Sequence, residues 1–209
     1  MDIGILGSGM IGSAVGRLLV DAGHKVAIAN SRGPESLEQL VSELGPLATA
    51  ASIPQAIAFG DPVVVLAIPF GRYQDLPAAE LAGRIAVDTT NYTPARDGRI
   101  GELASGSVTS SELIAGHLPG TRLVKSLNTL YYRTMLERAR PGAPRAERTA
   151  FFVAGDDAEA NALVARLVEE IGFAAVATGS LREGDARQGT GSAVFNVPLL
   201  VDQVRREGW

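Results

Sequence analysis

The sequence predicts an α/β fold: a doubly wound, mostly parallel sheet followed by a short helical C-terminal segment. The first indication is a strand-length apolar run, Asp2–Leu6, which meets a glycine turn, a helical pattern and a second strand at Lys25–Ala29. The second is that strand-length runs and helical patterns continue to alternate along the chain. This alternation is typical of a parallel sheet with right-handed crossovers and helices on both faces.

The glycine turn predicts a dinucleotide site. In the helix that follows, the apolar residues between Ile11 and Ala22 recur at helical spacing, and Gly23 ends it. Gly7 permits a tight turn, Gly9 lets a diphosphate approach the backbone, and Gly12 allows the helix to pack against the strand. The first N–H groups of the helix then face the diphosphate. The motif is G-x-G-x-x-G of the Rossmann type, and its expected cofactor-binding residues are Gly7, Ser8, Gly9, Met10, Ile11 and Gly12.

The end of the second strand indicates which dinucleotide binds. An NAD site usually carries an acidic residue about 20 residues beyond the glycines, where it binds the ribose hydroxyls. This chain has Asn30, Ser31 and Arg32 there instead. A hydroxyl and a guanidinium suit a 2′-phosphate, because both donate hydrogen bonds and the guanidinium adds charge. The residues therefore predict NADP(H).

The remaining elements follow from periodicity, capping residues and turn residues. Expected helices are Ser36–Leu44, one capped by Ser52 that runs through Phe59, one that includes Leu76–Leu81, one from Ser110 or Ser111 to His117, one led by Asp156-Asp157 through Ile171, and an amphipathic one from Ala193 to Glu207. Expected strands are Leu47–Ala51, Pro62–Ile68, Arg84–Asp88, Arg122–Leu127, Thr149–Ala154 and Phe173–Thr178. Residues 93–106 read as irregular and 137–149 as an exposed loop. We expect a dinucleotide-binding domain over residues 1–179, with the segment over 180–209 as the candidate for a separate element.

Ligands of open parallel sheets lie beyond the carboxyl ends of the strands. The segments that follow the central strands are therefore the expected site: Ile68–Phe70, Thr89–Asn91 and Asn128–Tyr132. From them we add further expected cofactor-binding residues, namely Ile68, Pro69, Phe70, Asn91 and Asn128.

Composition narrows the class of protein. The chain has 209 residues, is 46% hydrophobic and carries a net charge of −4. It therefore lacks the excess of basic residues expected of a protein that binds nucleic acid or an anionic membrane. It contains no cysteine, which excludes disulfides and thiolate chemistry, and it shows no motif for a metal. No apolar run approaches the roughly 18 residues of a membrane span, so we expect a cytoplasmic protein.

Few side chains are candidates for acid–base work. His24 lies in a helix-to-strand turn far from the expected ligand, and His117 ends a short helix, where a cation is favourable. Lys125 is expected to be an edge or surface lysine. Tyr131 and Tyr132 follow a central strand near the expected nicotinamide, so either a proton-donor role or a packing role is open for each.

Three stretches together resemble the F420-dependent NADP oxidoreductase family: Gly4 to Ala14, Ala29 to Pro34, and Ile68-Pro69-Phe70. The resemblance extends through Lys125 to Leu130 and Gly179-Ser180-Leu181. It implies that Ser31 and Arg32 hold the 2′-phosphate, that Ile68-Pro69 backs the nicotinamide riboside, and that residues around Leu130 and Tyr131 line the hydride-transfer cleft. It also implies that residues 180–209 complete this cleft, and that the protein is a homodimer to whose contact the same segment contributes.

Three functions remain open on these grounds. The first is hydride transfer between NADP(H) and a flavin-like acceptor, F420 or a flavin, which the lack of an acid–base set favours. The second is reduction of a small carbonyl or imine with Tyr131 or Tyr132 as proton donor. The third is a sensor that binds NADP(H) without turnover.

Overall fold

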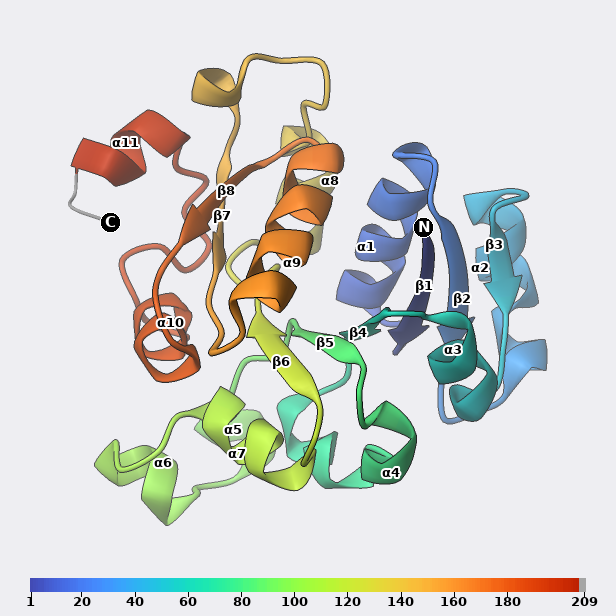
Figure 1. The fold of residues 1–209 in the computed structure, drawn as a ribbon, viewed down its shortest axis with the longest axis horizontal. Helices are drawn as coiled ribbons and strands as arrows, with labels where there is room; N and C mark the ends of the chain where they lie inside the picture. Colours follow the sequence, from blue (N-terminus) through green and yellow to red (C-terminus); the bar gives the residue numbers. More distant parts are fainter. Residues whose placement is uncertain (207–209) are drawn as a thin grey trace.

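The computed structural model describes residues 1–206, and its centre is a six-stranded sheet in the order β3-β2-β1-β4-β5-β6, with every neighbouring pair parallel (Figure 1). The predicted doubly wound, mostly parallel sheet is thereby confirmed. The strands of this sheet are β1 (Asp2–Leu6), β2 (Lys25–Ala29), β3 (Ala48–Ala50), β4 (Val63–Leu66), β5 (Ile85–Asp88) and β6 (Arg122–Lys125).

A second, two-stranded parallel sheet consists of β7 (Ala150–Val153) and β8 (Ala174–Ala177). It adjoins the first sheet through one isolated antiparallel bridge between Lys125 and Ala154. Both strands were expected, but periodicity alone did not reveal that they pair apart from the other six.

The helices have the following bounds. They are α1 (Met10–Asp21), α2 (Glu38–Leu44), α3 (Ile53–Phe59), α4 (Ala78–Leu81), α5 (Pro94–Asp97), α6 (Gly101–Ser105), α7 (Ser110–His117), α8 (Tyr132–Arg138), α9 (Ala158–Glu170), α10 (Leu181–Gln188) and α11 (Val201–Arg206). Three 3₁₀ segments are η1 (Pro34–Leu37), η2 (Phe70–Asp75) and η3 (Arg145–Glu147). Among these described helices, none is long and apolar enough to span a bilayer.

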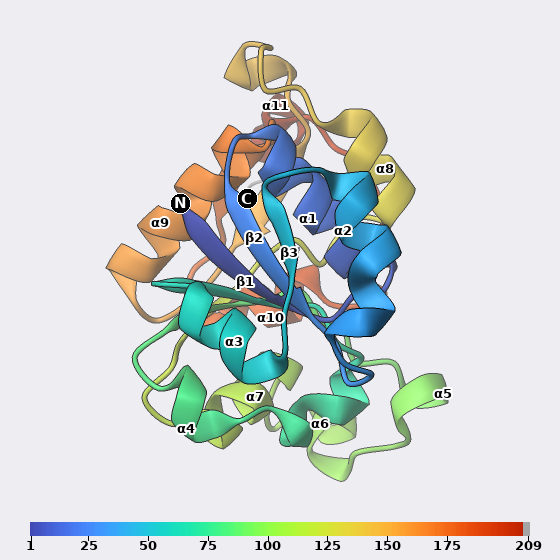
Figure 2. The ribbon, with the colours of Figure 1, turned by 90° about the vertical axis from the view of Figure 1, so that its right-hand side faces the viewer.

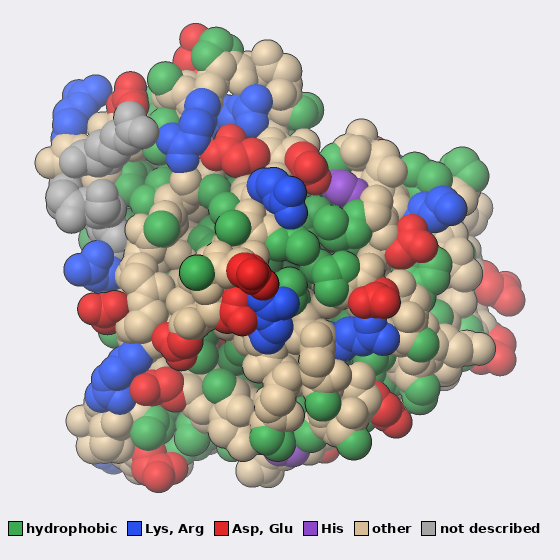
Figure 3. All heavy atoms as spheres, viewed as in Figure 1, with side chains coloured by type: hydrophobic (Ala, Val, Ile, Leu, Met, Phe, Trp, Pro, Cys, Tyr) green, Lys and Arg blue, Asp and Glu red, His purple; other side chains and the backbone are tan. Residues whose placement is uncertain are grey.

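Strand periodicity divides the core into two layers. Ile3, Ile5 and Val65 face α1, α2, α8 and α9, whereas Leu6 and Leu66 face α3, α4 and α7. Figure 2 shows α1, α2 and α8 on one side of the strands and α3 and α4 on the other. Because both faces are covered, β4 is a continuous buried run of valines and a leucine, as its sequence predicted. On the face seen in Figure 3, acidic and basic side chains are interspersed.

Three expectations about secondary structure before residue 190 were wrong. Residues 93–106 form two single-turn helices, α5 and α6, which are too short for a periodic signal. Helix α8 occupies residues 132–138, a segment for which no helix was listed and whose last residues, from 137, were expected to belong to an exposed loop. Helix α10 was not expected, although Ser180 and Glu183 form a capping box at its start.

The C-terminal helix is also shorter than predicted. It begins at Val201 instead of Ala193, because Asn196 has a φ of 59° and Pro198 cannot lie inside a helix. Its predicted end, Glu207, lies outside the described residues.

Candidate functional site

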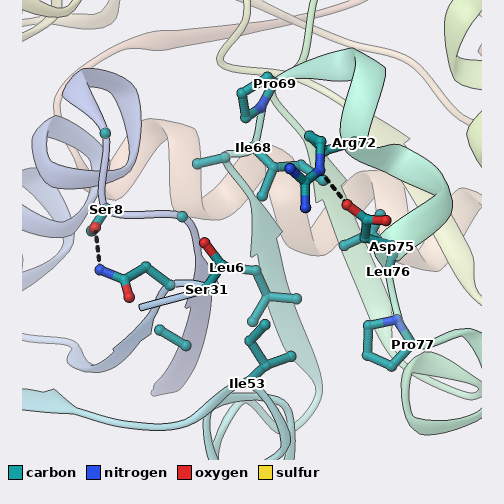
Figure 4. A pocket seen from close by; sticks show the side chains of 15 residues that line it. Leu6, Ser8, Ser31, Ile53, Ile68, Pro69, Arg72, Asp75, Leu76 and Pro77 are labelled. Atoms are coloured by element: carbon teal, nitrogen blue, oxygen red, sulfur yellow. Dashed lines mark hydrogen bonds and ion pairs between the residues drawn. The ribbon is translucent and has the colours of Figure 1, made fainter. Parts of the chain in front are cut away.

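A pocket of about 320 Å³ opens at the carboxyl ends of β1, β2 and β4 (Figure 4). Its walls are the glycine loop after β1, the loop after β2 and the segment after β4. The predicted site residues that line it are Gly7, Ser8, Gly9, Asn30, Ser31, Ile68 and Pro69. Three separate stretches of sequence thus meet at one place, as expected for a dinucleotide site.

The three glycines of the motif differ in what surrounds them. A Cβ on Gly7 would lie 2.1 Å from the Ala67 oxygen, and one on Gly12 would lie 2.0 Å from the Gly7 oxygen. Gly7 also has a φ of 115°, which L side chains rarely adopt. Around Gly9, by contrast, no described atom lies within 4 Å of the Cβ position. Gly7 and Gly12 are therefore required by the fold, whereas the space at Gly9 suits a ligand.

The start of α1 fits an anionic ligand. Gly9 is its N-cap and supplies no side chain, and the first turn contains no acidic residue. The first N–H groups of the helix are thus left to a partner outside it, and the positive end of the helix dipole points the same way. These residues fit the diphosphate of a dinucleotide.

The side chain of Asn30 connects the loops on two sides of the pocket. Its Nδ2 donates to the Ser8 Oγ at 3.0 Å and to the Ser36 Oγ at 2.9 Å. Its Oδ1 accepts from the backbone N–H of Arg32 at 2.8 Å. Asn30 therefore fixes the glycine loop relative to the loop that carries Ser31 and Arg32.

Ser31 and Arg32 are both exposed, but only Ser31 lines the pocket. Within residues 1–206 the guanidinium of Arg32 makes no hydrogen bond or ion pair, so it is available to a ligand at the pocket's rim.

Gly12, Met10, Ile11 and Phe70 also lie outside the pocket lining. Met10 is 61% exposed at the start of α1, and Ile11 packs against the core. Phe70 is fully buried, where its ring packs 5.2 Å from that of Tyr73 and 5.4 Å from that of Tyr92. The sequence placed Phe70 correctly after β4, but its side chain points into the core.

A further set of pocket residues, on α3 and after β4, was not predicted from the sequence. They are Ile53, Arg72, Asp75, Leu76 and Pro77. The rule that ligands lie beyond strand ends applies to the whole segment after β4, whereas our prediction stopped at Phe70. Figure 4 shows Arg72 and Asp75 paired on the wall opposite Ser31.

Asn91 and Asn128 meet at the ends of β5 and β6. The Asn91 Nδ2 donates to the Asn128 backbone oxygen at 2.8 Å, and the Asn128 Nδ2 donates to the Asn91 Oδ1 at 3.1 Å. The Asn128 Nδ2 also lies 3.3 Å from the Gln188 backbone oxygen in α10. Neither asparagine lines the pocket at the glycine loop, so they form a second polar group further along the sheet edge.

A buried charged cluster lies behind these asparagines. Lys125 and Asp88 are both 0% exposed, and the Lys125 Nζ lies 3.0 Å from the Asp88 Oδ2 and 3.4 Å from the Asp185 Oδ1. The Ser111 Oγ donates to Asp88 at 2.6 Å, and the Ser110 Oγ donates to Asp185 at 2.8 Å. The expectation that Lys125 lies at an edge or surface was therefore wrong, because two carboxylates stabilise it inside the protein.

Charge complementarity governs the protonation of this cluster. Burial alone would lower the pKa of Lys125, but the negative charges of Asp88 and Asp185 outweigh it and raise that pKa. Burial alone would likewise raise the pKa of Asp185, yet the charge of Lys125 and hydrogen bonds from Ser111 and Ser110 lower it. Lys125 and Asp185 are therefore both held in their charged forms and paired with one another.

Tyr131 and Tyr132 stack edge to face, with ring centroids 4.5 Å apart. Tyr132 borders a groove beside the glycine loop, together with Ser8 and Gly9. Its hydroxyl accepts a hydrogen bond from the Arg133 Nε at 3.0 Å, and this bond lowers the pKa of Tyr132. A hydrogen bond with Tyr132 raises the pKa of Tyr131, which is 46% exposed.

Both histidines contact other parts of the fold, and neither lines the pocket. His24 is buried, and its Nε2 lies 3.0 Å from a Glu170 oxygen. The His117 Nε2 lies 3.0 Å from the Leu76 backbone oxygen, and its ring meets Tyr73 edge to face. These contacts account for both side chains as parts of the fold.

The chain is similar to known proteins in both sequence and structure. The sequence profile of the family described as "NADP oxidoreductase coenzyme F420-dependent" matches residues 2–92. The chain is similar to a hypothetical protein from Sinorhizobium meliloti, with 30% identity, a TM-score of 0.82, and coverage of 96% of this chain and 95% of that one. No curated protein is significantly similar to it in sequence.

Two further structures are informative. A protein of Arthrobacter sp. FB24, proposed to be an F420-dependent NADP reductase, has 28% identity and a TM-score of 0.69 over 86% of this chain and 85% of that one. A reductive aminase from Aspergillus terreus in complex with NADPH has 20% identity and a TM-score of 0.60 over 88% of this chain and 57% of that one, which indicates the fold alone. The chain thus belongs to the NADP oxidoreductase family described as coenzyme F420-dependent, a family of enzymes for which NADP(H) binding is implied.

Proposed function

We propose that this enzyme transfers hydride between the nicotinamide of NADP(H) and a flavin-like ring such as coenzyme F420. The observation that carries the proposal is the chemistry at the ends of β5 and β6. The side chains there are the amides of Asn91 and Asn128, and the nearby Lys125 is engaged with Asp88 and Asp185. Hydride transfer between two planar rings depends on alignment and exclusion of water, and does not require an acid–base side chain.

In this proposal the chain binds and orients the two rings. The glycine loop and the start of α1 bind the diphosphate, Ser31 and Arg32 bind the 2′-phosphate, and Ile68-Pro69 backs the nicotinamide riboside. The bound reduced nicotinamide supplies the hydride. The apolar side chains around the nicotinamide keep water away from the two atoms between which the hydride moves.

The C-terminal segment from residue 180 completes the acceptor side of the cleft. The backbone N–H of Asn196 donates to the Thr129 oxygen at 2.6 Å, which joins this segment to the end of β6. In the same region, four buried side-chain atoms lack a hydrogen-bond partner among the described residues: Asn128 Oδ1, Thr129 Oγ1, Gln188 Oε1 and Ser192 Oγ. Buried polar atoms are usually hydrogen-bonded, so these four atoms favour a bound ring that has polar groups along its edge and can bond to them.

The deciding experiment mixes the purified protein with NADPH and oxidised F420, with FMN and riboflavin in parallel. Absorbance changes of the nicotinamide and of the acceptor are followed together. We expect NADPH oxidation matched mole for mole by acceptor reduction, fastest with F420. Tight NADPH binding with none of these acceptors reduced would contradict the proposal, and would favour the carbonyl or imine reductase or the non-catalytic sensor.

A reductase of a small carbonyl or imine is the second candidate, favoured by the hydrogen bond from Arg133 that lowers the pKa of Tyr132 beside the glycine loop. On this reading, replacing Tyr131 and Tyr132 together by Phe would lower turnover of such substrates by roughly 10²–10⁴, as expected for loss of a general acid. Steady-state rates with a panel of ketones and imines test it. Turnover that is unchanged in the double variant would exclude the tyrosines as donors.

We further propose a homodimer, on the basis of the family resemblance. Exposed apolar side chains at Met10, Tyr131 and Leu136 flank the groove beside α1 and suit a subunit contact. Light scattering of the purified protein measures the mass. A value equal to one chain over the micromolar range would overturn the dimer.

A further inference from the structure

Arg72 places a guanidinium on the pocket wall that faces Ser31. It belongs to η2, the 3₁₀ segment after β4, and it lines the pocket together with Ser31. Figure 4 shows its side chain reaching from this segment toward the interior of the pocket. Arg32, the arginine that the sequence pointed to, is not among the lining residues.

Most of the donors on Arg72 are available to a ligand. Its Nε pairs with the Asp75 Oδ2 three residues later, and the two side chains are 67% and 59% exposed. Within residues 1–206, neither Nη group makes a hydrogen bond. Exposed ion pairs contribute little to stability, so a doubly charged phosphate competes well with this carboxylate.

The surroundings of Arg72 suit the adenosine end of the cofactor. Ile53, Ile68, Leu76 and Pro77 supply an apolar lining that accepts a flat base. The glycine loop binds the diphosphate, so the adenosine half extends from there toward Ser31 at the end of β2. The ribose 2′ position then lies between the wall that carries Ser31 and the wall that carries Arg72.

We propose that Arg72 is a second determinant of the preference for NADP(H) over NAD(H), its Nη groups donating to the 2′-phosphate from the wall opposite Ser31. The proposal rests on the placement of NADP(H) in this pocket. Asp75 orients the guanidinium by accepting from Nε, and its negative charge reduces the affinity for the phosphate that Arg72 attracts. Arg72 thereby raises the affinity for the 2′-phosphate, and Asp75 lowers it.

The test measures binding of two adenosine fragments by calorimetry, 2′,5′-ADP with the 2′-phosphate and 5′-ADP without it. The variants are Arg72→Ala and Arg72→Lys, with Arg32→Ala for comparison and Arg166→Ala, an exposed arginine on α9, as the matched control. We expect Arg72→Ala to weaken 2′,5′-ADP roughly 10- to 100-fold, as for loss of a charged hydrogen bond, and 5′-ADP less than about threefold. Arg72→Lys is expected to fall between, because it retains charge without the planar fork.

The Asp75→Asn variant is expected to change the affinity for 2′,5′-ADP in the direction opposite to Arg72→Ala. The amide oxygen still accepts from the Arg72 Nε, while the negative charge near the phosphate is removed. We expect binding of 2′,5′-ADP to tighten about two- to fivefold, in the range of a partly screened charge, with 5′-ADP unchanged. Weaker binding of 2′,5′-ADP to this variant would contradict the assigned role of Asp75.

The outcomes separate this inference from the cofactor assignment. If the wild type prefers 2′,5′-ADP and Arg72→Ala retains that preference in full, Arg72 is not a determinant although the NADP(H) site stands. Equal weakening of both fragments by Arg72→Ala would also overturn it, because the residue would then act on the adenosine generally. If the wild type binds both fragments equally, the placement of NADP(H) itself fails, and the inference fails with it.

Discussion

Gly9 is the residue of the glycine motif whose role the structure separates most clearly from folding. Its φ of −75° is ordinary for any residue, and its Cβ position is open. We therefore expect Gly9→Ala to change the free energy of unfolding by less than about 0.5 kcal/mol, as for an unobstructed surface site. The new methyl group would occupy the space meant for the diphosphate and weaken NADPH by at least about tenfold, or roughly 1.4 kcal/mol.

Gly7→Ala is the matched comparison. Here the methyl group meets the Ala67 oxygen and the backbone has a positive φ, so the fold itself is expected to lose stability. Urea unfolding and fluorescence titration of NADPH measure the two effects. Equal losses of stability in the two variants would show that Gly9 also serves the fold.

Among the buried residues, Lys125 is the one whose replacement we expect to lower the free energy of unfolding most. Lys125→Met leaves the carboxylates of Asp88 and Asp185 inside the protein without their counter-charge, and about 3–5 kcal/mol of stability is expected to be lost at neutral pH. The exposed Lys25 on β2 provides the control, Lys25→Met, for which little change is expected. Urea unfolding of both variants at neutral pH checks this.

The same cluster predicts a pH dependence. The pKa of Asp185 is lowered in the fold, so its stabilisation is present above the unfolded value of about 3.9 and is lost as the pH falls through the folded value. The pKa of Lys125 is raised, so its stabilisation is present below about 10.4 and is lost as the pH rises through the folded value. In Lys125→Met the Asp185 carboxylate loses this support, and its protonation in acid should shrink the loss of stability relative to the wild type. A loss independent of pH would contradict the assignment.

At the scale of elements, α10 depends on a capping box that also concerns the acceptor side. The Ser180 Oγ accepts from the Glu183 N–H at 3.3 Å, and the Glu183 carboxylate accepts from the Ser180 N–H at 2.9 Å. Ser180→Ala should lower stability by about 1 kcal/mol, as for other cap losses. Because α10 carries Asp185 and Gln188, the KM for the acceptor should rise more than that for NADPH.

Helix α3 supplies the reciprocal control. Its capping box joins Ser52 and Gln55, and its first residue, Ile53, lines the cofactor pocket. Ser52→Ala should therefore cost similar stability but raise the KM for NADPH more than that for the acceptor. Steady-state kinetics of the two variants side by side decide this. The same pattern of KM changes in both would show that the two helices do not serve separate ends of the site.

Sequence patterns predicted elements well where one face of a long segment is buried. Strands β1 and β2 have the predicted bounds, and α9 follows its predicted cap, Asp157. The patterns failed where tertiary contacts decide the structure. Single-turn α5 has no periodicity, and its Asp97 is held by the backbone N–H groups of Gly71 and Thr93, which no local pattern reveals.

At the scale of the whole molecule, parallel topology explains why much of the pocket was predictable. Once β1, β2 and β4 are adjacent and parallel, the segments after them must meet at one edge, and Gly9, Ser31 and Ile68 do so. Side-chain direction did not follow from topology. Phe70 turns into the core, while Arg72, two residues later in a 3₁₀ segment, reaches the pocket.

The cluster around Lys125 was beyond prediction for a related reason. Its members lie on β5, β6, α7 and α10, far apart in the chain, and a lysine within an apolar strand gives no sign of its partners. Asp185 and Ser110, for example, are separated by 75 residues and meet only because α7 and α10 pack together. Charge pairs between residues this far apart in the sequence can be identified only in the folded structure.

The Asn30 amide has a consequence for the timing of coenzyme exchange. Through its bonds to Ser8 and Ser36, it sets the spacing of two subsites before any coenzyme arrives. When one end of the coenzyme is bound at its subsite, the other end is at high effective concentration near the second subsite. Little ordering of the loops is then needed for the second end to bind. In the proposed site both ends of NADP(H) would have to be detached at the same time for release, so we expect slow coenzyme dissociation that limits the rate of successive turnovers.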